Sequence, residues 1–210
     1  MGGGETSLVN LCDVLRENNK VVVVCAVDGK LVSILRNKGI KTYVLDYRNK
    51  KKLFLNLLKI RHLIKDEQID VIHSNDPLTS VIMYYASVGK KISTYWTCHG
   101  QWYNFKGLRR WLIKHSNKHI FCVSTKVRDS LVKMGFTKMT VTYLGIPLDK
   151  YANAESSNLR KEFKIESNAI LLGCIGRFQP IKGQMKLVEA VKQLIKKNYN
   201  IVCVFIGGCI

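Results

Sequence analysis

Short apolar runs alternate along this chain with amphipathic stretches of helical spacing, and this alternation limits the folds open to it. The run 20–27, KVVVVCAV, is continuous and β-branched, as in a strand buried on both faces of a parallel sheet. The stretch 5–18 before it and the stretch 30–39 after it both have the spacing of a helix. Similar pairs follow as far as residue 145, so the sequence predicts an α/β fold with parallel strands in an open sheet.

The segment 151–167 interrupts the alternation because it is polar and contains no long apolar run. A strand pattern (AILLGCIG), a helix pattern and another strand pattern follow it. We therefore predict a Rossmann-like domain at 1–150, a linker at 151–167 and the start of a second Rossmann-like domain at 168–210. Since the pattern opens with a helix and stops early in the second unit, we expect a fragment truncated at both ends, without the first strand of its first domain.

The chain is strongly basic, with 34 Lys and Arg residues against 15 Asp and Glu residues and a formal net charge of +19. Such an excess raises the local concentration of anionic partners, which include nucleic acid, anionic lipid and phosphorylated substrates. Charge alone does not choose among these three classes.

Cysteine usage and the N-terminal sequence bear on location. The seven cysteines lie mostly in apolar segments without a CxxC pair, which is typical of reduced, buried thiols in a cytosolic protein. No apolar run approaches the ~20 residues of a membrane-spanning helix, and the start, MGGGETSLVN, lacks a secretory pattern. We expect a cytoplasmic protein, with peripheral attachment to the inner face of the membrane as an option.

Polar and glycine residues cluster where the predicted strands end. Rossmann and related folds bind ligands at the carboxyl ends of their strands, so these loops are the first place to look for a site. The loops read HSND, CHGQW, VST, LGIPLD and GRFQPIKG, and they supply the candidates His73, Asn75, His99, Gly100, Ser124 and Gly145.

The last of these loops, GRFQPIKG, contains two cations. Arg177 offers a planar fork that can grip two phosphate oxygens, and Lys182 offers a point charge. Gly183 follows, just before a predicted helix whose N-terminus carries partial positive charge. This arrangement suits a diphosphate, although two solvated loop cations would give the same sequence.

The ordered series GGGE, VIHSN, TCHG, FCVST, VTYLGIPLDKY and GRFQPIKG resembles glycosyltransferase family 4, whose members have the GT-B fold. The resemblance covers essentially the whole chain. It implies two Rossmann-like domains facing a cleft, with a nucleotide-sugar donor held mainly by the C-terminal domain and an acceptor by the N-terminal one. It further implies transfer with retention of anomeric configuration, no cofactor besides the donor substrate, and no metal.

The resemblance also assigns roles to residues. Gly3 and Gly4 match the glycines whose backbone lies near the donor phosphate, and Arg177 and Lys182 match the pair that binds the donor diphosphate. His99 matches the catalytic histidine near the transferred sugar. The possible cleft-lining residues are Gly100, His73, Asn75, Ser124 and Gly145.

Two departures from the family pattern stand out. Leu144 occupies a turn position where the family usually has Asn, which puts the role of that turn in doubt. The glutamate pair that grips the donor in the family would lie beyond Ile210, so we expect the 210 residues alone to be inactive. The expected whole enzyme builds cell-surface polysaccharide or glycolipid on a carbohydrate or lipid-linked acceptor.

Two other classes of function stay open. The segments 50–65 and 102–118 interleave basic and apolar residues, which also suits a basic nucleic-acid- or membrane-binding protein without catalysis. A nucleic-acid partner is not expected, because no recognition motif is present. A sugar-nucleotide epimerase of the same fold is the other alternative.

Overall fold

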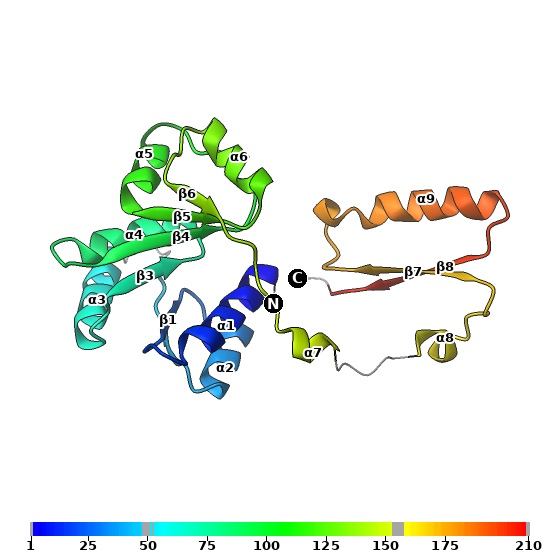
Figure 1. Cartoon of the computed structure of the whole chain (residues 1–210), viewed down its shortest axis with the longest axis horizontal. Helices are drawn as coiled ribbons and strands as arrows, with labels where there is room; N and C mark the ends of the chain where they lie inside the picture. The colour runs from blue at the N-terminus through cyan, green and yellow to red at the C-terminus, as the bar shows by residue number, and fades with distance from the viewer. Residues whose placement is uncertain (1, 48–50, 52, 153–157, 209–210) are drawn as a thin grey trace. The chain divides into compact units, whose positions relative to one another are not determined.

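The structure, a computed structural model, describes residues 2–47, 51, 53–152 and 158–208 (Figure 1). It divides into two compact units, Met1–Leu148 and Asp149–Ile210. The predicted linker 151–167 contains the end of one short helix, α7 (Leu148–Ala152), and the whole of another, α8 (Leu159–Glu162). Its residues 153–157 lie outside the described residues, as do residues 48–50 and 52 of the predicted basic segment.

The first unit alternates helices and strands along its whole length. In chain order these are α1 (Gly3–Leu15), β1 (Val22–Cys25), α2 (Lys30–Asn37), β2 (Lys41–Val44), α3 (Leu53–Asp66), β3 (Val71–Ser74), α4 (Pro77–Ser87), β4 (Ser93–Cys98), α5 (Gly107–Ser116), β5 (His119–Cys122), α6 (Thr125–Lys133) and β6 (Met139–Val141). All pairings between these strands are parallel, which confirms the α/β class.

The strands of the first unit are divided between two sheets. β1 pairs with β2, and β3, β4, β5 and β6 form a second sheet in that order. Among the described strands, β1 and β3 do not hydrogen-bond to each other, so the predicted open sheet is present as two parts. In the larger part, Cys98 lies opposite Cys122, and both are fully buried.

The larger sheet is covered on one face by α5 and α6. Inward-facing residues of β4 and β5 pack there against residues of both helices and of the loops beside them. Together they form the main core: Trp96, Cys98, Phe105, Ile113, Ile120, Cys122, Val127, Leu131 and Phe136.

A second apolar cluster joins the two sheets. Ile60 and Ile64 of α3 pack with Met83 of α4, and this cluster also contacts Val24 of β1 and Ile72 of β3. Burial of apolar side chains from both sheets stabilises the unit as one body although their strands do not pair.

The carboxylate of Glu67, which follows α3, adds a polar connection. It is 5% exposed, and it pairs with Lys41 Nζ at 2.5 Å and Lys20 Nζ at 2.9 Å. Tyr43 Oη donates a hydrogen bond to it as well. Hydrogen bonds from Lys41, Tyr43 and Lys20 lower the carboxyl pKa of Glu67 to about 2. The end of α3 is thereby tied to the β1–β2 sheet.

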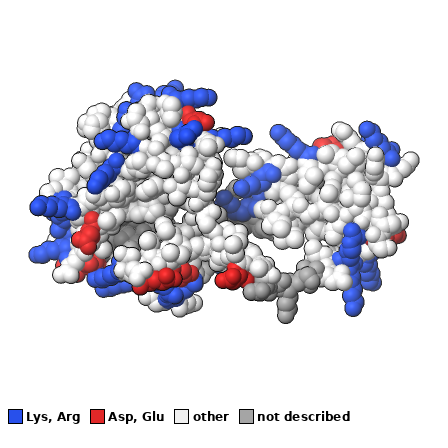
Figure 2. Space-filling view, in the orientation of Figure 1, with Lys and Arg blue, Asp and Glu red and all other residues white. Residues whose placement is uncertain are grey.

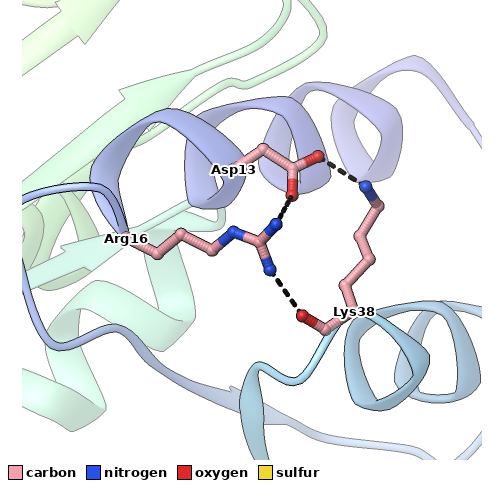
Figure 3. Close-up of polar contacts among 3 residues, drawn as sticks. All are labelled: Asp13, Arg16 and Lys38. Carbon is pink, nitrogen blue, oxygen red and sulfur yellow. Dashed lines mark hydrogen bonds and ion pairs between the residues drawn. The ribbon is translucent and has the colours of Figure 1, made fainter.

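Helix α1 is held against the end of α2 by a three-residue polar cluster (Figure 3). Asp13 lies 2.7 Å from Lys38 Nζ and 3.7 Å from Arg16, and Arg16 donates to the carbonyl oxygen of Lys38. These contacts, together with Val9 and Cys12 in the core, fix the direction in which the N-terminus of α1 points.

The second unit contains one parallel βαβ motif. Strand β7 (Ile170–Ile175) leads through a 3₁₀ turn, η2 (Pro180–Lys182), into α9 (Gln184–Lys196), and β8 (Ile201–Ile206) follows. β7 and β8 pair in parallel along their full length. This is the strand–helix–strand order that the sequence predicts for the region after residue 168.

Candidate functional site

Two side-chain bridges cross from β3 to β4 where these strands end. His73 Nε2 lies 2.6 Å from Thr97 Oγ1, and Asn75 Oδ1 lies 2.8 Å from His99 Nε2. In the strand register Ser74 is opposite Trp96, so both bridges run diagonally along one face of the sheet. Three predicted site residues, His73, Asn75 and His99, are thus brought together at the carboxyl edge of the sheet.

The N-terminus of α1 lies over the ring of His99. A Cβ atom added to Gly4 would lie 3.9 Å from His99 Cγ, which is ordinary van der Waals contact. Gly3, one residue earlier, is exposed, and a Cβ there would meet no atom within 4 Å. Gly4 and His99 are therefore neighbours within the first unit, although they are 95 positions apart in the sequence.

His99 is partly buried, and this burial lowers its pKa, so the ring is neutral at pH 7. The pKa of His73 is lowered as well, by loss of solvation and by the neighbouring His99. With the Asn75 carbonyl oxygen as acceptor, Nε2 of His99 carries the hydrogen and Nδ1 is left as an acceptor. A neutral imidazole held in this way can orient a ligand hydroxyl by a hydrogen bond.

The Trp102 ring packs on Gly100, the residue that follows His99. A Cβ at Gly100 would lie 1.8 Å from a ring carbon of Trp102, so the ring packs directly on the Gly100 backbone. Trp102 is 66% exposed and also contacts Tyr103, with ring centroids 5.6 Å apart. Gly100 was a predicted cleft residue and Trp102 was not, although it stands two positions later in CHGQW.

Two other candidates occupy separate positions. The Ser124 hydroxyl accepts a hydrogen bond from the Val127 backbone at 3.3 Å and caps the N-terminus of α6, which gives it a structural role. Gly145 is exposed, and a Cβ there would meet nothing within 4 Å. Among the described contacts, none joins either residue to His99.

In the second unit, Arg177 and Lys182 are both exposed in the loop that follows β7. Gln184 Nε2 donates to the carbonyl oxygen of Arg177 at 2.8 Å and holds the loop against the start of α9. Gly183 has φ of 73°, a left-handed conformation that favours glycine, and it is the N-cap residue of α9. Lys182 therefore lies immediately before the positive end of a 13-residue helix.

The end of β8 supports this loop from the other side. A Cβ at Gly207 would lie 1.9 Å from the Gly176 carbonyl oxygen, so the two backbones are in direct contact. Gly176 N donates to Ile206 O at 2.9 Å, and Phe178 N donates to Gly208 O at 3.2 Å. Neither Gly207 nor Gln184 is predicted from the sequence as a site residue. The sequence signal for Gly207 is the pair Gly207–Gly208, which directly follows the last predicted strand.

Cys98 and Cys122 are buried thiols at the carboxyl ends of β4 and β5. Burial raises the pKa of Cys98 to about 12 and that of Cys122 to about 11, so these thiols are core residues. Within the described ranges, no group of three or more His, Cys, Asp or Glu side chains is arranged to hold a metal ion. Independence from metals stays a prediction.

Comparison with solved structures defines the class. The chain matches a crystal structure of Anabaena Alr3699/HepE in complex with UDP, with a TM-score of 0.81, 18% identity and coverage of 100% of this chain and 58% of that chain. The same protein in complex with UDP-glucose gives a TM-score of 0.79 at 19% identity, covering 99% of this chain and 58% of that one. A glycosyltransferase from Rickettsia africae gives 0.79 at 21% identity, with 97% and 56% covered. The fold is therefore of the GT-B type.

A comparison of the sequence with protein-family models identifies the family. The model of Glycosyltransferase Family 4 matches residues 1–150, and the chain belongs to this family. No curated protein matches the chain. The chain spans 58% or less of the length of the three solved structures described above.

Proposed function

We propose that the protein transfers a sugar from a nucleoside-diphosphate sugar to an acceptor. The observation that carries this proposal is the family match over residues 1–150. The two Anabaena structures contain UDP and UDP-glucose, which favours a uridine nucleotide and a hexose as the donor's parts. The acceptor we propose is a carbohydrate or a lipid-linked carbohydrate, in polysaccharide or glycolipid synthesis.

In this proposal Arg177 and Lys182 bind the donor diphosphate. When the bond to the sugar breaks, negative charge grows on the departing diphosphate, and fixed positive groups stabilise that charge. The position of Lys182 before the N-terminus of α9 adds the backbone N–H groups of the first helical turn. These groups supply the electrostatic part of catalysis without a metal or further cofactor.

The proposed role of His99 is to orient the transferred sugar through a hydrogen bond. Its neutral ring and its contact with Asn75 support this role. A ring held in one orientation positions a ligand hydroxyl more accurately than a ring that can rotate. Gly3 and Gly4 keep the backbone beside His99 free of side chains, so that the donor phosphate can approach. Retention would follow from attack on the same face, with the departing phosphate accepting the acceptor's proton.

We further propose that the acceptor lies close to a membrane surface. Helix α5 exposes Leu108 (71%) and Trp111 (51%) beside Arg109 and Arg110, and α3 exposes Phe54 (72%). Figure 2 shows Lys and Arg side chains over the visible surface of both units, with fewer acidic ones. Basic residues near an anionic membrane contribute roughly 1 kcal/mol each. Among the described helices, none is long and apolar enough to cross a bilayer.

The test is a donor assay with the full-length protein. Incubation with UDP-glucose and other nucleotide sugars should yield a glycosylated acceptor and free nucleoside diphosphate. A donor that is isomerised without transfer would identify an epimerase instead. Salt-sensitive binding to random oligonucleotides, without protection by nucleoside diphosphate, would favour a nucleic-acid-binding protein.

A further inference from the structure

A cavity of about 410 Å³ opens at the amino-terminal edge of the larger sheet. Its walls include Ser93 at the start of β4, the last turn of α5 and the loop before β6. His99 follows the other end of β4, which is six residues long, so the cavity lies about 20 Å from that histidine. A volume of this size is within the range of small-molecule sites.

Three lysines, Lys114, Lys118 and Lys138, line this cavity, and its lining contains no Asp or Glu. Lys118 Nζ lies 3.3 Å from Ser93 Oγ, its hydrogen-bond partner. In the part of the chain that the structure describes, no carboxylate forms an ion pair with any of the three. The cavity therefore concentrates positive charge that the protein does not neutralise.

The lysines belong to segments that are fixed relative to one another. The backbone N–H of Lys118 donates to Thr94 O at 2.8 Å, and Ile120 N donates to Lys138 O at 2.9 Å. Asn117, 5% exposed, donates to Ile113 O at 2.8 Å and closes the end of α5. The backbones that carry the lysines are therefore held in place, which limits the ordering cost of binding to that of the lysine side chains.

A simpler explanation covers only part of this arrangement. Cations near a helix C-terminus are favourable because the last carbonyl groups carry about half a negative charge. Lys114 is in the last turn of α5 and fits that role. Lys118 and Lys138 lie outside the helix, so stabilisation of the helix end does not explain why all three lysines line the cavity.

We propose that this cavity binds a phosphate-type anion. The phosphate group can come from a soluble phosphomonoester or from a lipid headgroup, and the chemistry that recognises it is the same. The lysine cluster belongs to the first unit and the loop with Arg177 to the second, and the proposal stands whether or not the protein transfers a sugar.

The test combines titration with inorganic phosphate, at constant ionic strength, and NMR of the backbone and Asn117 amide signals. In the wild-type chain, signals around Ser93 and Asn117 should shift and saturate. The pair Lys114→Gln and Lys138→Gln should weaken binding at least about fivefold, the scale expected for two exposed charge contacts. The matched control pair is Lys126→Gln and Lys192→Gln, which removes the same charge from exposed sites and should bind phosphate like the wild type.

A second arm distinguishes the source of the phosphate. Phosphatidylcholine vesicles containing phosphatidic acid are compared with vesicles that contain phosphatidylglycerol at equal charge density. Preference for phosphatidic acid that is lost in the cavity pair and kept in the control pair supports a lipid source. Saturation by inorganic phosphate without vesicle preference supports a soluble source. Absence of saturable binding to either probe, or equal losses in both lysine pairs, overturns the proposal.

Discussion

Substitution of Gly207 by alanine should distort the loop 176–183, which contains Arg177 and Lys182, because the new methyl group has no space beside Gly176. The Cβ would lie 1.9 Å from the Gly176 carbonyl oxygen and 2.9 Å from its carbon, both of which are backbone atoms. The two strand ends must separate by about 1 Å or more to restore normal contact. The bonds from Gly176 N to Ile206 O and from Phe178 N to Gly208 O would then be strained or lost. At about 1–3 kcal/mol for overpacking and about 1 kcal/mol for each of the two bonds, we expect a loss of about 3–5 kcal/mol.

Hydrogen exchange of individual amides gives the sharpest measurement of this effect. In Gly207→Ala, the amides of Gly176 and Phe178 should lose protection, and chemical denaturation of the second unit should move to lower denaturant. Gly208→Ala is the matched control, because a Cβ at Gly208 meets nothing within 4 Å. If Gly207→Ala matches Gly208→Ala in stability and in protection of both amides, the packing argument is refuted.

Two further predictions concern other parts of the chain. Gly100→Ala should displace the exposed Trp102 ring, at a cost of about 1 kcal/mol, and unchanged tryptophan fluorescence would contradict this. Burial lowers the pKa of His99 in the folded protein below its ordinary value of 6.5. Below pH 6.5 the unfolded chain therefore binds more protons at this residue than the folded protein does. The free energy of unfolding should consequently fall as pH falls through about 6.5. Urea denaturation at pH 7 and pH 5 should show a smaller difference for His99→Asn than for wild type, and equal differences would refute this.

The order of helices and strands could be predicted from the sequence because each parallel strand is a short apolar run between helical stripes. The run 20–27 contains β1, and the stripe 5–18 overlaps α1, which begins two residues earlier at Gly3. Short helices α7 and α8 were missed because five or fewer residues give no periodic signal. The division into two sheets was not visible either, since the pattern of a strand does not say which neighbour it pairs with.

The candidate site was predictable where it depends on strand ends. His99 and Asn75 follow adjacent strands, so parallel pairing alone places them together. The contact of Gly4 with His99 depends on how α1 packs, which the sequence does not specify. Gly207 was missed for a related reason, because its importance comes from contact with the Gly176 backbone on another strand.

The central claim is that Arg177 and Lys182 bind the diphosphate of a sugar donor. The most direct measurement is the turnover of a nucleotide sugar by the full-length protein, for wild type, Lys182→Ala and the control Lys186→Ala on α9. We predict at least ~100-fold lower turnover for Lys182→Ala, the scale of losing one preorganised charge stabiliser, and little change in acceptor binding. Lys186→Ala should stay close to wild type. Wild-type turnover in Lys182→Ala would contradict the account.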